Sequence, residues 1–165
     1  MGSQAISGTG RSPLAYIRAL VAALRSRRIL SATSPAPLVR EFHEAFGLPI
    51  ADRPAFDGIS SKQAELRVRL LLEEAEEYRS ASERGDLPAV ADALADVVYV
   101  AYGSALEWGI DLDQALLEVH ATNMSKGTGE GGPMVDSSGK VMKPRGWRAP
   151  TMARALGVPG KSESK

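Results

Sequence analysis

The chain has 165 residues, of which 44% are hydrophobic and only 5% aromatic, and its formal net charge is zero. Many aliphatic and few aromatic side chains are typical of a helical domain rather than a β-sandwich. A neutral chain has no general attraction for nucleic acid or anionic membranes, and the absence of cysteine excludes disulfides, thiolate metal sites and cysteine nucleophiles. We therefore expect a cytoplasmic all-α protein with one domain, and neither nucleic acid nor a membrane as partner.

The chain divides into three expected segments: a basic extension and linker over 1–35, a helical domain over 36–126, and a hairpin arm and tail over 127–165. The first segment contains five arginines and no acidic residue, and the proline-rich stretch SATSPAPL follows it. The extension is either a targeting or partner-binding helix or, more simply, a segment outside the folded core.

The spacing of apolar side chains predicts four helices in the middle segment. They cover roughly 37–46, 60–85, 86–109 and 111–126, and an amphipathic stretch over 13–30 is a candidate fifth helix. Capping residues mark three of the starts, because Ser60, Asp86 and Asp111 each precede an apolar periodic run.

Four glutamates lie within the strongly apolar pattern LRVRLLLEEAEEYRSA of the second predicted helix. Successive residues of a helix turn by about 100°, which places Glu73, Glu74 and Glu77 on one half-buried arc. Glu76 falls on the solvated face instead. Because like charges one turn apart repel one another, the three grouped glutamates indicate a compensating cation.

The third predicted helix is apolar nearly all round, and Asp92 and Asp96 are its only charges between Leu87 and Leu106. A helix of this kind is buried on most sides, so we expect an oligomer interface in addition to the core of one chain. A carboxylate in such surroundings needs a metal ion or a basic partner to stay charged. Together with the glutamates, these aspartates could supply the oxygen ligands that Mg²⁺ prefers, with Mn²⁺ as a possible substitute.

The fourth predicted helix ends with Asn123 and Lys126 on its inward face. This end of the helix either borders a site or simply frays, with Lys126 as a cation at the helix C-terminus.

The segment MVDSSGKVM predicts a small β-hairpin with its turn at Ser138-Gly139. Basic residues and one tryptophan follow in the same arm. They are Lys140, Lys143, Arg145, Trp147 and Arg148. The arm could be a mobile lid over an anionic substrate, or a solvated tail.

The segments LLLEEAEEYRSA and DALADVVYVAYGSALEWGIDLDQALLEVHATNMSK resemble the all-α nucleoside triphosphate pyrophosphatase superfamily of MazG-like and dimeric dUTPase-like proteins. These proteins carry Glu-x-x-Glu on one helix and Glu-x-x-Asp on the next, followed by a helix with asparagine and a basic residue. The resemblance covers roughly residues 38–126. It implies an antiparallel bundle of four to five helices that forms a homodimer or a higher homo-oligomer.

The resemblance also implies roles for individual residues. The implied metal ligands are Glu74, Glu77, Asp96, Asp92 and Glu73. The implied catalytic carboxylates are Glu73, Glu74 and Glu77. The expected substrate-binding residues are Asn123 and Lys126, together with Lys143 and Arg145 of the arm. One position departs from the pattern, because Ala93 stands where a glutamate is expected, and either Asp92 or Glu73 would then supply the missing ligand.

The activity that the resemblance implies is Mg²⁺-dependent hydrolysis of a nucleoside triphosphate between its α- and β-phosphates, giving a monophosphate and pyrophosphate. The preferred expectation is dUTP to dUMP, with other non-standard or pyrimidine deoxynucleotides as alternatives. Ala93 also leaves open a helical oligomer that binds nucleotide or metal without catalysis. A third alternative is a helical interaction protein whose acidic cluster is only a charged face.

Overall fold

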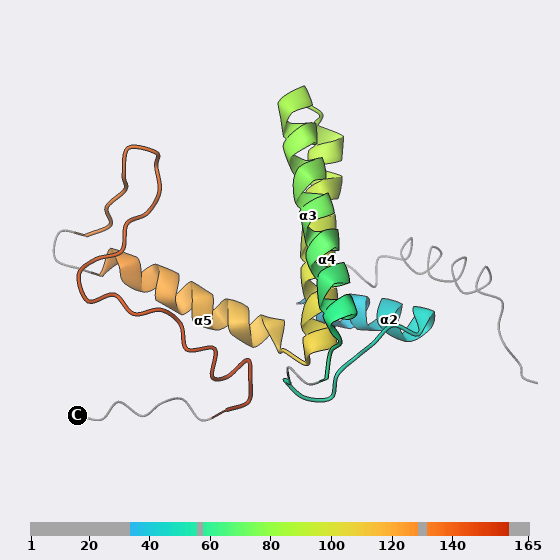
Figure 1. Cartoon of the computed structure of the whole chain (residues 1–165). Helices are drawn as coiled ribbons and strands as arrows, with labels where there is room; N and C mark the ends of the chain where they lie inside the picture. Colours follow the sequence, from blue (N-terminus) through green and yellow to red (C-terminus); the bar gives the residue numbers. More distant parts are fainter. Residues whose placement is uncertain (1–33, 56–57, 129–131, 159–165) are drawn as a thin grey trace, which may run out of the picture. The chain divides into compact units, whose positions relative to one another are not determined.

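Figure 1 shows the chain as a computed structural model, in which residues 34–55, 58–128 and 132–158 are described. The helices follow in the order α2 (Ala36–Phe46), α3 (Ser61–Arg84), α4 (Leu87–Trp108), α5 (Leu112–Met124) and the 3₁₀ helix η2 (Ser125–Gly127). These described ranges contain no β-strand, so the expected all-α class is confirmed. The basic extension expected over 1–35 lies almost entirely outside the described residues.

The helix ends lie where the capping residues predicted them. Ser60 Oγ accepts a hydrogen bond from the Gln63 amide at 3.3 Å, and the Gln63 side chain accepts one from the Ser60 amide at 3.0 Å, which completes the capping box of α3. Asp86 caps α4 and Asp111 caps α5 through side-chain oxygens. Three helices end at a glycine in the left-handed conformation: Gly47, Gly85 and Gly109.

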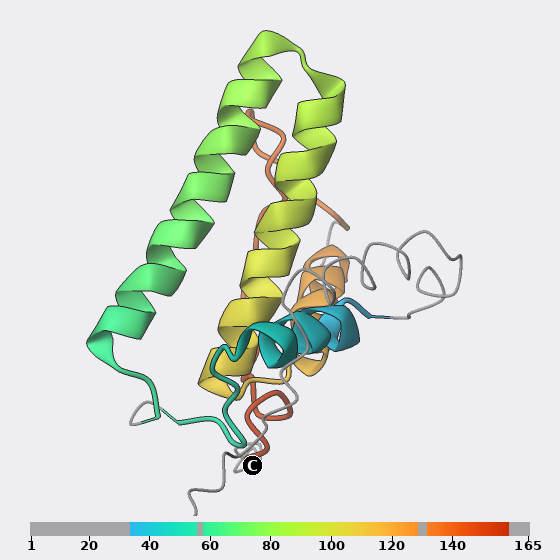
Figure 2. The same cartoon turned by 90° about the vertical axis from the view of Figure 1, so that its right-hand side faces the viewer.

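Helices α3 and α4 run side by side as an antiparallel hairpin, and α2 packs against α4 (Figures 1 and 2). Because only Gly85 and Asp86 separate the two helices, α4 runs back antiparallel to α3. Small residues such as Ala81 and Ala93 are buried at 1% and 3% exposure, which lets the helix axes approach closely. From α2, Phe42 packs edge-on against Tyr99 of α4 with the ring centroids 5.7 Å apart.

A buried ion pair joins α3 to α4. Arg67 is 8% exposed and Glu107 is 7% exposed, and Arg67 Nη1 lies 3.4 Å from Glu107 Oε1. The other guanidinium nitrogens donate to Ser104 Oγ at 3.0 Å and to the Val100 carbonyl at 2.8 Å. Burial lowers the pKa of Arg67, and the negative charge of Glu107 opposes this shift. Because a buried charge is tolerated only when it is paired and hydrogen-bonded, these contacts fix the register of α3 on α4.

Gly103 makes room for this ion pair and for His43 of α2. A Cβ atom at Gly103 would lie 2.5 Å from Arg67 Nη2 and 2.9 Å from His43 Nε2. His43 is 2% exposed, and its Nδ1 donates to the Pro49 carbonyl at 2.9 Å, since a carbonyl oxygen can only accept. His43 is therefore a structural histidine, and three helices meet at one glycine.

A closed bundle is not formed within one chain, which differs from the expectation. Helix α5 packs along neither α3 nor α4. Helix α4 was expected to be buried on most sides, but Leu94 and Val98 are 46% and 45% exposed, and Val68 and Leu72 of α3 are 57% and 65% exposed. Among the described helices, none packs over this face. By length and composition α4 would also pass as one candidate membrane span, which is weak evidence for a lone apolar helix.

The predicted β-hairpin of the arm is reduced to a turn and a single antiparallel bridge between Val135 and Val141. Asp136 Oδ1 accepts hydrogen bonds from the Ser138 and Lys140 amides at 2.9 and 3.0 Å and so builds the turn. Prolines at 133 and 144 flank the bridge. Because proline has no amide hydrogen to donate, the ladder cannot extend into two full strands.

We expect Gly103→Ala to lower the free energy of unfolding by about 1–3 kcal/mol, because the added methyl group must displace the paired guanidinium or the histidine. Urea denaturation followed by circular dichroism measures this change. Gly58→Ala is the matched control, since its added methyl group would meet only Ala55 atoms at 3.9 Å. Equal stability of the two variants would show that Gly103 is not needed for the packing of α2, α3 and α4.

Candidate functional site

The carboxylates that the sequence singled out come together across the α3–α4 hairpin. Burial raises the pKa of Glu74, and the charges of Asp96, Glu77, Glu73 and Asp92 raise it further, in decreasing order of effect. Two of these neighbours come from α4, so α3 and α4 together form the acidic group. We call these five residues the carboxylate cluster. Its excess of negative charge is unfavourable without a cation.

Of the three glutamates predicted on a half-buried arc of α3, Glu74 is half-buried, whereas Glu73 and Glu77 are exposed. Glu76 lies on the exposed face, where a hydrogen bond from Arg79 is the main cause that lowers its pKa. Glu73 forms an ion pair with Arg69 at 3.5 Å. Glu73 is therefore the glutamate of the carboxylate cluster that a neighbouring cation already engages.

Ala93, which replaces the glutamate of the family pattern, is buried at 3% exposure. The adjacent Asp92 is exposed and still contributes to the raised pKa of Glu74. A carboxylate at position 93 would thus have to be accommodated in the core, while Asp92 reaches the cluster from the next position. Within the described residues, no three histidine, aspartate or glutamate side chains lie close enough together to hold a metal ion. The five carboxylates lie close enough for their charges to interact, but their oxygen atoms are not close enough together to coordinate one ion.

A cavity of about 480 Å³ opens beside Asp96. Its lining is mostly apolar and includes Phe42, Gln63, Leu66, Tyr99 and the buried Arg67–Glu107 pair. Burial raises the pKa of Tyr99, with a smaller contribution from the charge of Glu41. The cavity therefore joins one carboxylate of the cluster to an aromatic wall contributed by α2 and α4. The sequence did not predict this cavity, because its walls come from three separate helices.

Three of the four predicted substrate-binding residues gather around a tryptophan. Lys126 Nζ donates to Asn123 Oδ1 at 2.7 Å, and the ammonium groups of Lys126 and Lys143 lie 5.5 and 4.4 Å from the centroid of the Trp147 ring. Arg145 is exposed on the same arm. These residues are not brought to the carboxylate cluster of the same chain, since they lie in the last turn of α5 or beyond it, and α5 packs along neither α3 nor α4.

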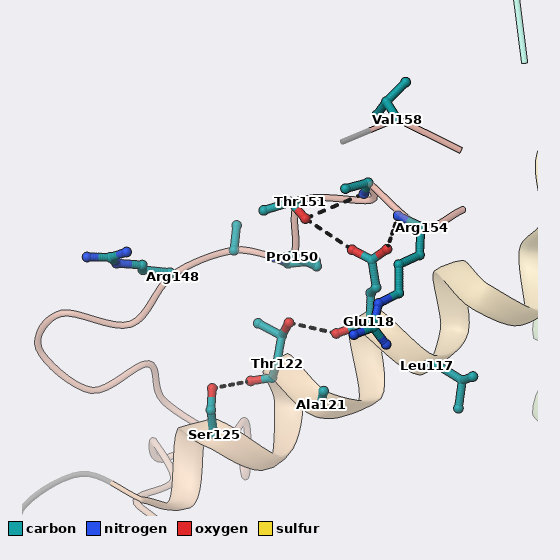
Figure 3. A pocket seen from close by; sticks show the side chains of 12 residues that line it. Leu117, Glu118, Ala121, Thr122, Ser125, Arg148, Pro150, Thr151, Arg154 and Val158 are labelled. Atoms are coloured by element: carbon teal, nitrogen blue, oxygen red, sulfur yellow. Dashed lines mark hydrogen bonds between the residues drawn. The ribbon is translucent and has the colours of Figure 1, made fainter. Parts of the chain in front are cut away.

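The arm is fastened along α5 at two points that the sequence analysis missed. Trp147 Nε1 donates to the Thr122 carbonyl at 3.1 Å. The carboxylate of Glu118 accepts hydrogen bonds from the Arg154 amide at 2.7 Å and the Thr151 hydroxyl at 3.3 Å (Figure 3). Burial raises the pKa of Glu118, but hydrogen bonds from the backbone of 152–155 and from Thr151 outweigh it and hold the pKa below its usual range. The sequence did contain a signal for this contact: Glu118 is the last acidic residue of α5, and an arm rich in basic residues follows it.

We expect Glu118→Gln to loosen this attachment, because a carboxamide offers one acceptor oxygen where a carboxylate offers two. The pKa of Glu118 is lowered in the folded protein, so its contribution is present above the ordinary glutamate pKa of about 4.3 and is lost as the pH falls through the lower, folded value. The Arg154 amide resonance in proton–nitrogen spectra should hold its position from neutral pH down to about 5 and then move.

In Glu118→Gln the same resonance should be displaced at every pH. Glu76→Gln is the control, because its partner Arg79 lies on α3 and not on the arm. An unchanged Arg154 resonance in Glu118→Gln would contradict the assignment of this anchor.

The part of the chain that contains the α3–α4 hairpin matches a known protein family. Residues 39–123, slightly more than half of the chain, match the family described as phosphoribosyl-ATP pyrophosphohydrolase. The search of curated proteins gave no match. The matched range contains the whole carboxylate cluster and Asn123, and it leaves out Lys126 and the arm. It gives no support to a preference for dUTP. The chain belongs to the phosphoribosyl-ATP pyrophosphohydrolase family, within the all-α, MazG-like pyrophosphatase superfamily that its sequence resembles, and this family indicates a hydrolase of nucleotide phosphoanhydrides.

Proposed function

We propose that this protein hydrolyses nucleoside triphosphates between the α- and β-phosphates, releasing a nucleoside monophosphate and pyrophosphate. The observation that carries the proposal is the carboxylate cluster, in which two helices bring acidic residues close enough to raise the pKa of Glu74. The family match supports the reaction class, because its members are described as pyrophosphohydrolases. The acids come from two helices and converge on Glu74 and Asp96, the two half-buried members of the cluster.

The donor set of the cluster fits a hard divalent cation. Carboxylate oxygens are the ligands that Mg²⁺ and Mn²⁺ prefer, and the uncompensated charge around Glu74 favours binding of a cation. Glu74, Glu77 and Asp96 are the proposed ligands, with Asp92 and Glu73 as additional ones. When bound, Mg²⁺ supplies charge neutralisation for the substrate phosphates and helps to orient the attacking water.

The chain itself supplies the proton acceptor for the attacking water. A carboxylate whose pKa is raised toward neutrality is a better general base than an ordinary exposed one. The pKa of Glu74 is raised in the metal-free protein, and Glu77 lies one turn away on the same helix. The proposed base is whichever of the two carboxylates does not bind the cation. Glu73 is a weaker candidate for this role because Arg69 already engages its carboxylate.

The cavity beside Asp96 is suited to the nucleoside end of the substrate. Its mostly apolar walls and the Tyr99 and Phe42 rings provide surface for a flat base, next to the carboxylates that would act on the phosphates. Phosphoribosyl-ATP carries an additional sugar phosphate on its base, which would need a cation there. Arg67 is the cation that lines the cavity, and it is already committed to Glu107, Ser104 and Val100.

This arrangement favours a compact nucleotide with no phosphate on its base. We therefore keep dUTP as the preferred substrate, with phosphoribosyl-ATP, the substrate in the family name, as the second candidate.

We also propose that two copies of the chain complete the site. The cations expected to contact substrate phosphates lie on α5, η2 and the arm, apart from the carboxylates of the same chain. Large apolar side chains of α3 and α4, including Val68, Leu72 and Val98, are exposed. A continuous apolar face of this kind is typical of a protein interface. A homodimer that covers the α3–α4 face could bring the cations of one copy to the carboxylates of the other, in a cytoplasmic enzyme.

The proposed function is tested by incubating the purified protein and Mg²⁺ with a panel of nucleoside triphosphates and phosphoribosyl-ATP, and by measuring monophosphate and pyrophosphate. We expect Glu74→Ala, Glu77→Ala and Asp96→Ala each to lower kcat on the order of 100-fold or more, since each removes a metal ligand or the proton acceptor. Glu76→Ala is the matched control and should stay near wild type, because Glu76 is paired with Arg79 and lies outside the carboxylate cluster.

Full activity of Glu77→Ala would contradict the site. Absence of pyrophosphate from every nucleotide in the panel would overturn the function.

We expect Leu72→Glu to convert the dimer to a monomer, because it places a charge in the exposed apolar face of α3. Sedimentation velocity measures the change, with Lys62→Glu on the solvated side of the same helix as the control. A monomeric wild type, or a Leu72→Glu variant that remains dimeric, would refute this interface.

A further inference from the structure

The C-terminal arm, residues 132–158, lies outside the range that matches the family, which ends at residue 123. The arm is nevertheless fastened to α5 through Trp147 and Glu118. An exposed tail with no role would not need two such anchors. The arm therefore calls for an explanation beyond the family core.

Trp147 organises two cations from different parts of the chain. Its indole N–H donates to the Thr122 carbonyl at 3.1 Å, which fixes the ring against the end of α5. Lys126 of η2 and Lys143 of the arm place their ammonium groups 5.5 and 4.4 Å from the centroid of this ring. An aromatic face attracts cations through its quadrupole, and tryptophan does so most strongly. We call Trp147, Lys126, Lys143 and Asn123 the tryptophan cluster.

The two ammonium groups have no anionic partner in the part of the chain that the structure describes. None of the salt bridges formed there involves Lys126 or Lys143. The neighbouring acids are committed elsewhere, because Glu118 accepts hydrogen bonds from 151–155 and Asp136 closes its own turn. Lys126 is half-buried and Lys143 is exposed, so both can be reached from solvent. Two like charges held beside one ring favour a ligand that carries several anionic oxygens.

We propose that the tryptophan cluster binds the polyphosphate of the nucleotide substrate, and that Trp147 is a positioning residue that holds Lys126 and Lys143 at a fixed separation. This inference rests on the proposed function and adds to it Trp147 and Lys143, which lie outside the range that matches the family. Lys126 and Lys143 contact the phosphates, whereas Trp147 acts through them. The arm is then a fixed wall of the phosphate site, in place of the mobile lid that the sequence allowed.

A polyphosphate explains the cluster better than single-stranded nucleic acid does. Proteins that bind single strands stack successive bases on several aromatic side chains along a basic groove. Trp147 is the single aromatic residue of residues 132–158, and two cations already lie beside it.

Direct binding can be measured without catalysis. The chain has two tryptophans, so Trp108→Phe leaves Trp147 as the sole fluorescent reporter. Titration of this full-length variant with tripolyphosphate, in the absence of divalent metal, should give a saturable change in emission. Lys143→Gln and Lys126→Gln should each weaken this binding by about fivefold to tenfold, since each removes one charge from the phosphates. Lys140→Gln should not weaken it, because Lys140 lies in the turn of the same arm and its side chain is not beside the ring.

Steady-state kinetics provide the second measurement. We expect Trp147→Leu to raise KM for the nucleotide about tenfold while kcat changes less than about threefold, because a positioning residue for phosphate binding affects binding before chemistry. Trp147→Phe keeps an aromatic face and should recover part of the loss. Thermal unfolding of both variants should match wild type, which separates positioning from a loss of folding.

The outcomes separate this inference from the proposed function. Wild-type KM values in Trp147→Leu and Lys143→Gln, in an enzyme that does release pyrophosphate, would overturn the inference and leave the function standing. Saturable tripolyphosphate binding by a protein that hydrolyses no nucleotide would overturn the function and support the cluster as an anion site. Tighter binding of a single-stranded thymidine oligonucleotide than of tripolyphosphate would overturn the assignment of the ligand.

Discussion

The buried ion pair between Arg67 and Glu107 is the interaction on which the rest of the structure depends. It joins α3 to α4 at the end of the hairpin where α2 crosses, and Gly103 lets His43 and the guanidinium share one small space. A buried pair of this kind adds little net stability, because the desolvation of both charges offsets their attraction, but breaking it is costly. Its effect is on register, since it determines which residues of α4 face Glu74 and Glu77 farther along the hairpin. The acidic cluster and the cavity beside Asp96 both follow from this register.

The chain separates its charges between two structural elements. Acidic side chains gather on the α3–α4 hairpin, and unpaired cations gather where α5, η2 and the arm meet around Trp147. Within the described residues, the hairpin carries negative charge without a cation, and the tryptophan cluster carries positive charge without an anion. The hairpin also exposes large apolar side chains. Burial of these side chains against a second copy would relieve both deficits, because hydrophobic association and charge complementarity would act in the same assembly. The described residues of one chain give no such compensation.

Local features of the sequence predicted most of the fold. The capping residues and glycines set the helix ends. The turn of about 100° per residue placed Glu74 on the half-buried side, but it did not predict that Glu77 is as exposed as Glu76. Sequence reasoning missed the interactions that join distant segments. Arg67 and Glu107 stand in apolar patterns in which a lone charge looks like a surface residue, and only their pairing across two helices explains their burial.

The anchoring of the arm by Glu118 and Trp147 was missed for the same reason, since it links residues more than twenty positions apart. The β-hairpin expectation failed because prolines at both ends remove ladder donors.

The account is tested most directly by mixing two variants that are both nearly inactive when the nucleotide is held far below the KM of the lysine variant. One carries Glu77→Ala, and the other carries Lys126→Gln together with Lys143→Gln. If the carboxylates of one copy act with the cations of the other, a mixed dimer contains one site with neither defect, and pyrophosphate release should return after subunit exchange. If each chain uses its own carboxylates and cations, every site keeps a defect. An exchanged mixture that stays as inactive as its two components would contradict the account.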